Sequence, residues 1–95
     1  MTVVTLMWEA RAADGRGAEL LAWARGRELP GVPPLRRETF RAPGDRVLVL
    51  TWWAVLPESE ALPDLPELPE LPDPAPELIS RPVHRWRFES VDFPR

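Results

Sequence analysis

RVLVLTWWAVL, from Arg46 to Leu56, is the most strongly patterned stretch of this chain, and the other elements can be placed around it. Its apolar, β-branched and aromatic residues show no helical period, which is typical of a β-strand buried on both faces. Alternate positions form one face with Val47, Val49, Thr51, Trp53 and Val55, and a second face with Leu48, Leu50, Trp52 and Ala54. Because neither face is polar, we expect other parts of the molecule to cover both.

Two elements are predicted before this strand. Val3 to Ala10 (VVTLMWEA) is apolar on both faces, which favours a second strand at the centre of the sheet. Asp14 is a candidate N-cap for a following helix, and Pro30 with Gly31 predicts where that helix has ended. The helical spacing in between is carried by Ala18, Leu21, Ala22, Arg25 and Leu29.

A hairpin is predicted between residues 35 and 56. Leu35 to Arg41 (LRRETFR) carries charge, as an edge strand does. The next four residues, Ala42 to Asp45, place proline and glycine where a type II turn requires them. A two-residue turn would put Arg37 on the face of Trp52, and a one-residue error in register would exchange the faces. The pairs expected with that turn are Phe40 with Val47, Glu38 with Val49, and Arg36 with Thr51.

The composition changes between Pro57 and Pro76, where prolines and acids predominate and no base occurs. A Leu-Pro-acid unit is repeated four times from Leu62 to Asp73. Polyproline II has three residues per turn, so this repeat aligns its leucines on one edge and its acids on another. Proline at every third position excludes an α-helix. Since the rest of the chain has more arginines than acids, we expect an acidic strap that crosses the sheet.

The chain ends with a short helical turn at Ala75 to Ser80 and a strand at Val83 to Ser90 (VHRWRFES). The two faces of this strand differ sharply in polarity, which predicts an edge strand with one buried face. The face expected to be buried carries His84, Trp86 and Phe88, and the other carries Arg85, Arg87 and Glu89.

This order of elements predicts one α+β domain over residues 1–95. The two apolar strands belong in the centre and the two partly polar strands at the edges, which gives an antiparallel sheet ordered 4-1-3-2, with the central pair expected to be parallel. This is the ferredoxin-like βαββαβ plan, with its second helix largely replaced by a polyproline II-like crossover at residues 57–76. With only one helix, the open sheet face is expected to be covered by self-association, by the leucines of the crossover, or by both.

The element order and the strands VVTLMWEA, RVLVLTWWAV and VHRWRF resemble those of the dimeric α+β barrel superfamily, which includes the antibiotic-biosynthesis-type monooxygenases. The resemblance covers most of the chain. It implies a homodimer in which two ferredoxin-like sheets pack face to face. It also implies that each protomer binds, or oxidises without a cofactor, an aromatic small molecule.

His84 is the only histidine, and histidine is the side chain that ordinarily titrates near neutral pH. It is either a general base or an axial ligand in an aromatic pocket, or a packed strand residue beside Trp86 and Phe88. The aromatic residues either line that pocket or pack in the core and dimer interface. The candidate site comprises His84 as proton carrier, Arg37 and Arg85 to polarise a ligand oxygen, and Trp8, Trp52, Trp86 and Phe88 to contact the ring.

Composition excludes several other classes of protein. There is no cysteine, and one histidine with scattered carboxylates has no metal-ligand spacing, so neither a metal nor a cofactor is expected. A net charge of -3 gives no general attraction to nucleic acid or anionic membranes. No signal sequence or membrane-spanning stretch is evident, and we expect a cytoplasmic protein.

A second hypothesis is a non-catalytic protein-interaction module. Here the Leu-Pro-acid segment, extended in advance at low entropic cost, docks on a partner surface. The same segment is alternatively only a strap on its own sheet, or wraps the other protomer of a dimer. Deleting Leu62 to Asp73 separates these hypotheses, because loss of a strap unfolds or monomerises the protein whereas loss of a docking motif leaves the fold intact.

Overall fold

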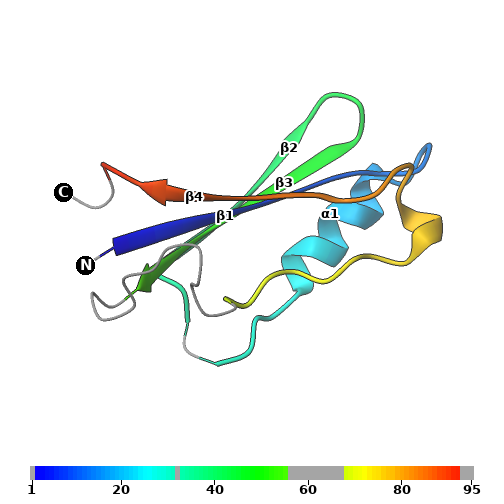
Figure 1. The fold of residues 1–95 in the computed structure, drawn as a ribbon. Helices are drawn as coiled ribbons and strands as arrows, with labels where there is room; N and C mark the ends of the chain where they lie inside the picture. Colours follow the sequence, from blue (N-terminus) through cyan, green and yellow to red (C-terminus); the bar gives the residue numbers. More distant parts are fainter. Residues whose placement is uncertain (1, 32, 56–67, 93–95) are drawn as a thin grey trace.

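The computed structural model describes residues 2–31, 33–55 and 68–92 (Figure 1). The predicted strands, the helix and the short helical turn all occur within these residues. In chain order they are β1 (Thr2–Arg11), α1 (Gly17–Gly26), β2 (Arg36–Ala42), β3 (Arg46–Val55), a 3-10 helix (Pro76–Leu78) and β4 (His84–Ser90).

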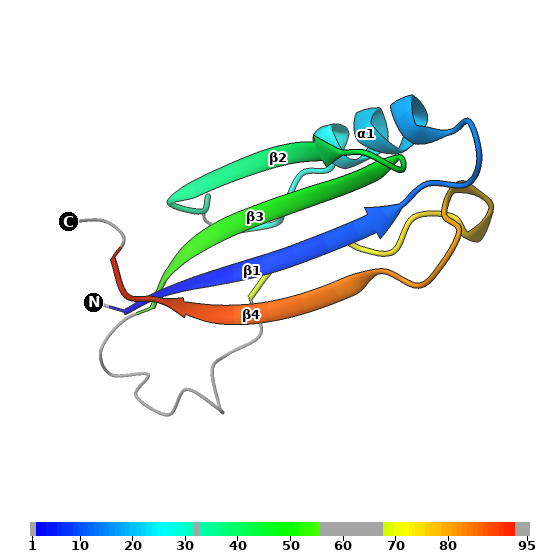
Figure 2. The same cartoon turned by 90° about the horizontal axis from the view of Figure 1, so that it is seen from above.

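The strands form one antiparallel sheet in the order β2-β3-β1-β4, as Figure 2 shows. This confirms the predicted spatial order and is consistent with a ferredoxin-like arrangement. The expectation of a parallel central pair is wrong, because Thr2 lies opposite Val55 and Arg11 lies opposite Arg46. Strands β1 and β2 run in the same direction but are not neighbours. Strand β3 lies between them and is antiparallel to both.

The β2–β3 hairpin differs from its predicted register by one residue. Its loop contains three residues, Pro43 to Asp45, because Ala42 pairs with Arg46. Gly44 and Asp45 both have positive φ angles, of 80° and 58°. Asp45 is therefore an additional residue in left-handed conformation, and it moves every side chain of β2 to the opposite face from the one expected.

Helix α1 begins later than its predicted N-cap. The Arg16 amide donates to the Ala13 carbonyl at 2.9 Å, and Gly15 has a φ of 77°, so Asp14 lies in a turn. The N-cap position falls on Arg16, which makes no capping bond through its side chain. The Asp14 prediction was wrong because the glycine after it allows the chain to turn before the helix starts.

Helix α1 and the segment from Leu68 to Leu78 lie on the same side of the sheet (Figure 1). Leu20 and Ala24 of α1 are fully buried against it, as are Leu71 and Leu78 of the segment. Hydrophobic burial at about 25 cal/mol per Å² makes this layer a main source of stability. The strand residues beneath it are Trp8, Ala10, Val47 and Val49 in one cluster, and Val4, Leu6, Trp53 and Val55 in another.

Part of the Leu-Pro-acid repeat is visible in this layer. Leu68 is half-buried and Leu71 and Pro74 are buried, whereas Glu70 and Asp73 are exposed. This spacing of three is the one that the repeat predicts. Residues 57–67, which make up most of the predicted crossover, lie outside the described residues, so its overall conformation remains a prediction.

Candidate functional site on the open sheet face

The sheet face opposite α1 is covered by no described part of the chain. We call it the open face. The prediction that the aromatic side of β4 is buried is therefore wrong for the protomer, in which Trp86 is 65% exposed and Phe88 is 50% exposed. The apolar side chains on this face include Phe40 from β2, Leu48, Leu50 and Trp52 from β3, Met7 from β1, and Trp86 and Phe88 from β4.

These side chains form one continuous apolar surface. Met7 lies between Leu50 and Trp86 in the cross-strand register. Thr5, one step along β1, lies between Trp52 and Phe88. Adjacent side chains on one face of paired strands are within contact distance of each other. A shallow hollow at the β4 side of this surface is lined by Met7, Val83, His84, Arg85, Trp86 and Phe88.

A charged cluster borders the hollow. Glu9 lies opposite His84 in the β1–β4 register, and its carboxylate accepts hydrogen bonds of 2.7 and 3.0 Å from Nη2 of Arg81. The same carboxylate oxygen, Oε1, is 3.6 Å from Nδ1 of His84. The Glu9 side chain is only 17% exposed, whereas that of His84 is 62% exposed. A carboxylate thus lies behind an accessible imidazole.

A second charged pair lies at the β2 edge of the open face. The Arg36 guanidinium lies 5.4 Å from the ring centroid of Trp52 and donates to Glu38 at 2.7 Å. Arg36 is therefore the arginine that shares a face with the exposed aromatic residues. The predicted pairing of Arg36 with Thr51 would have put Arg36 on the opposite face, because that pairing requires a hairpin loop shorter by one residue.

The predicted site residues divide between the two faces of the sheet. Trp52, His84, Trp86 and Phe88 lie together on the open face, whereas Trp8, Arg37 and Arg85 lie on the covered face. Trp8 is only 3% exposed and stacks on Trp23 with ring centroids 5.9 Å apart. The structure therefore does not bring the seven residues into one pocket.

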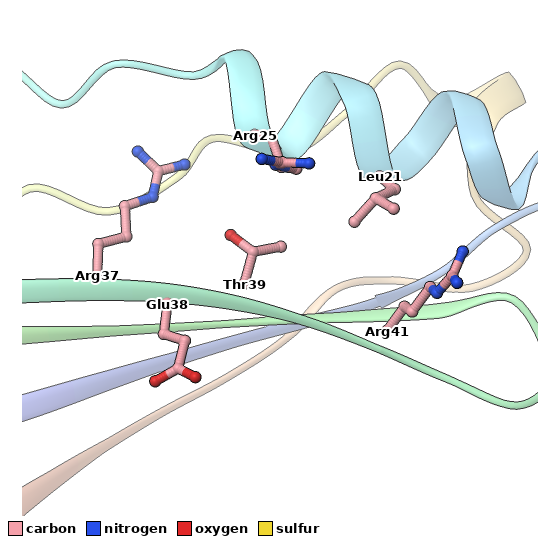
Figure 3. Close-up of a pocket in the computed structure, with 6 residues that line it drawn as sticks. All are labelled: Leu21, Arg25, Arg37, Glu38, Thr39 and Arg41. Atoms are coloured by element: carbon pink, nitrogen blue, oxygen red, sulfur yellow. The ribbon is translucent and has the colours of Figure 1, made fainter.

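Arg37 lies in a groove between β2 and α1, shown in Figure 3. Its two terminal nitrogens donate to the carbonyl oxygens of Ala24, at 2.7 Å, and Arg27, at 2.6 Å. Burial lowers the pKa of the Arg37 guanidinium. In Figure 3 Thr39 and Arg41 also extend toward α1, while Glu38 extends to the opposite side. Arg37 thus caps the end of the helix.

Arg85 fastens the Leu68–Leu78 segment to β4. Its Nη2 donates to the Leu71 carbonyl at 2.8 Å and lies 2.8 Å from Oδ1 of Asp73. Glu70 is a third partner, at 3.7 Å from Nε. Arg85 is on this face because side chains alternate along a strand, so it points away from its neighbours His84 and Trp86.

Sequence reasoning missed Glu9, Arg81 and the position of Arg36. The one sequence signal that pointed to this cluster is Glu9, since it is the only acid in a mostly apolar predicted strand. Its pairing with His84 could not be recognised without the β1–β4 register. Among the described residues, no group of three or more His, Cys, Asp or Glu side chains could hold a metal ion.

The fold and this face define a small α+β protein with a four-stranded antiparallel sheet, one covered face and one exposed aromatic face. No family model, curated protein or solved structure matches the chain. No helix in the described ranges is both long enough and apolar enough to cross a membrane.

Proposed function

We propose that the protein is a homodimer that binds a flat aromatic small molecule between the open faces of two copies. The observation that carries this proposal is the continuous apolar surface formed by Met7, Leu50, Trp52, Trp86 and Phe88. Oxidation of the bound compound by molecular oxygen without a cofactor, which the resemblance to dimeric α+β barrels implies, is part of the same proposal.

The size of the open face favours a second copy as its cover. The edge strands β2 and β4 have seven residues each. Four strands about 4.8 Å apart and about 3.3 Å per residue give a flat area of about 19 by 23 Å, or about 440 Å². The apolar side chains occupy the central part of this area, and the largest apolar patch on a monomer is often functional.

The distribution of charge on the open face also favours a second copy of the chain as its cover. Its centre has apolar side chains, while Arg36 and Glu38 lie at the β2 edge and Glu9 and Arg81 lie near β4. In each pair the positive charge of the arginine is balanced by the negative charge of the glutamate. Two identical copies therefore meet with a charge-poor centre and a polar rim, which is the usual composition of a protein interface.

Trp86 and Phe88 suit a flat ligand. Both retain large exposed fractions beside the hollow at β4, and a second sheet would enclose this hollow. Aromatic walls with a few polar groups are typical of small-molecule sites. Arg37 and Arg85 are not part of this proposal, because both lie on the covered face, and Arg36 lies at the opposite edge of the sheet from the hollow.

The competing proposal, an interaction module that uses the Leu-Pro-acid repeat, is less well supported. Leu68 and Leu71, from two of the four repeat units, pack against the protein's own core. Arg85 also contacts Asp73 and, at longer range, Glu70. These contacts favour a strap over a docking motif for this part of the repeat.

Sedimentation equilibrium and tryptophan fluorescence test the proposal. We expect a dimer at micromolar concentration, and saturable quenching by 4-nitrophenol that Trp86→Ala abolishes. Trp23→Phe is the matched control, because Trp23 stacks on Trp8 in the covered layer and its loss should leave saturable quenching. A monomer that shows no saturable quenching with any of a diverse set of aromatic compounds would overturn the proposal.

A further inference from the structure

The cluster of Glu9, Arg81 and His84 lies where a proton from a bound ligand could be accepted. Glu9 is on β1 and His84 is its direct partner on β4, whereas Arg81 precedes β4. The cluster therefore joins two strands at the border of the open face. His84 and Trp86 alternate with Arg85 along β4, so the imidazole and the indole extend from the same face.

Arg81 holds the Glu9 carboxylate in one orientation. One guanidinium nitrogen contacts both carboxylate oxygens, at 2.7 and 3.0 Å. Only 27% of the Arg81 side chain and 17% of the Glu9 side chain are exposed. A shielded, charge-assisted contact of this kind is stronger than one in open solvent. The carboxylate is thus fixed before any ligand arrives.

Glu9 in turn faces one nitrogen of His84. Its Oε1 is 3.6 Å from Nδ1, which a small rotation of the exposed ring would shorten to a hydrogen bond. Catalytic contacts are often this long before a ligand binds. Within the described parts of the chain, Nε2 of His84 has no hydrogen-bond partner. This second nitrogen belongs to a ring that lines the hollow with Met7, Trp86 and Phe88.

We infer that Glu9, Arg81 and His84 form a proton-accepting site for an aromatic ligand with an acidic hydroxyl group, such as a phenol. This inference rests on the proposed function, because the ring of the phenol binds against Trp86 and Phe88. The hydroxyl proton passes to Nε2 of His84, the O–H bond breaks, and its electron pair stays on the oxygen as phenolate. The imidazolium formed faces the Glu9 carboxylate, which acts as a positioning residue.

Three other charged groups lie near His84. Arg85, the next residue, is turned to the covered face and contacts Asp73. Arg11 and Arg46 lie opposite each other in the β1–β3 register, two residues along from Glu9 and Leu48 and farther from Trp86. All three are cations. They do not accept a proton from a phenol, so His84 is the accessible acceptor within the cluster.

Titration of 4-nitrophenol in the presence of the protein tests the inference. The phenolate absorbs visible light and the phenol does not, so absorbance reports ionisation while tryptophan quenching reports binding. We expect the apparent pKa of the bound compound to fall by about one unit with the natural protein. His84→Gln should abolish this fall and leave quenching intact, because His84 is exposed and its replacement keeps the fold.

Glu9→Gln should reduce the fall without abolishing binding, and Glu38→Gln is its matched control. Glu38 is an acid on the same face but at the opposite edge, paired with Arg36, so its replacement should leave the fall unchanged. An equal fall in His84→Gln and the natural protein would overturn the proton-accepting site alone. Absence of saturable quenching with 4-nitrophenol would overturn both the site and the ligand class on which it rests.

Discussion

Arg37 stabilises the end of α1 through its guanidinium group. The last carbonyl groups of a helix have no partner within it, and a cation near them also interacts favourably with the helix dipole. Arg37 supplies two donors, to Ala24 and Arg27, from the adjacent strand β2. Arg37 was predicted to polarise a ligand oxygen, but in the protomer it stabilises the end of the helix.

Arg37→Met should lower the free energy of unfolding by about 1–3 kcal/mol, since it removes two charge-assisted hydrogen bonds and keeps the aliphatic stem. Urea denaturation followed by circular dichroism measures this. Arg41→Met is the control, because Arg41 lines the same groove and no hydrogen bond or ion pair to it is found in the described residues. Equal midpoints for the two variants would contradict the capping role.

Glu19 provides a test by pH. The hydrogen bond from Arg16 lowers the pKa of the Glu19 carboxyl. Because the pKa is lowered in the folded state, the pair contributes above the unfolded pKa, and that contribution is lost as pH falls through the folded pKa. Arg16→Gln should raise the pKa of Glu19 toward its ordinary value, as measured by NMR titration of the carboxyl carbon. Arg25→Gln, in the same helix, should leave it unchanged.

At the scale of elements, the segment from Leu68 to Leu78 covers one face of the sheet together with α1. Its leucines enter the core at a spacing of three residues, and Arg85 binds it to β4. A chain with proline at every third position cannot form a helix but can present one apolar edge. The segment therefore covers the sheet without a helical hydrogen-bond pattern.

Leu71→Ala should cost about 2–4 kcal/mol of unfolding free energy, because it leaves a cavity in the core. Leu71 is 3% exposed, whereas Leu35 is 47% exposed. Leu35→Ala is therefore the matched control and should cost about 0.5 kcal/mol or less. If chemical denaturation gives equal costs for the two substitutions, the segment does not pack against the sheet.

At the scale of the whole molecule, the two faces of the sheet are unequal. One receives α1 and the Leu68–Leu78 segment, while the other has Trp86 and Phe88 largely exposed. Burying the open face against a second copy would remove these rings from water at about 25 cal/mol per Å². That gain is the driving force for the proposed dimer.

Leu50→Arg should weaken the dimer by at least about 100-fold, because a charge at the centre of the interface costs about 3 kcal/mol to bury. Its cross-strand neighbour in the protomer is Glu38, so the fold should tolerate the added cation. Sedimentation equilibrium measures the change. Ala22→Glu, on the exposed side of α1, is the control and should leave the mass unchanged. An unaltered dimer in Leu50→Arg would exclude the open face as the interface.

The amino-acid sequence was enough to predict which strands are central, where the hairpin lies, where the short helical turn falls and in what order the strands pair. These features follow from periodicity along the chain and from proline and glycine, which act locally. The three-residue spacing of Leu68, Leu71 and Pro74 likewise follows from a local pattern in the proline-rich segment.

Which residues meet on each face depends instead on how distant parts of the chain pair in the folded protein. The left-handed Asp45 lengthens the hairpin loop by one residue, which moves Arg37 beneath α1 and brings Arg36 over Trp52. Glu9 and His84 are joined by pairing between the two ends of the chain. Register between strands depends on loop conformation and on contacts between distant segments, and a one-residue shift reverses the face of every side chain.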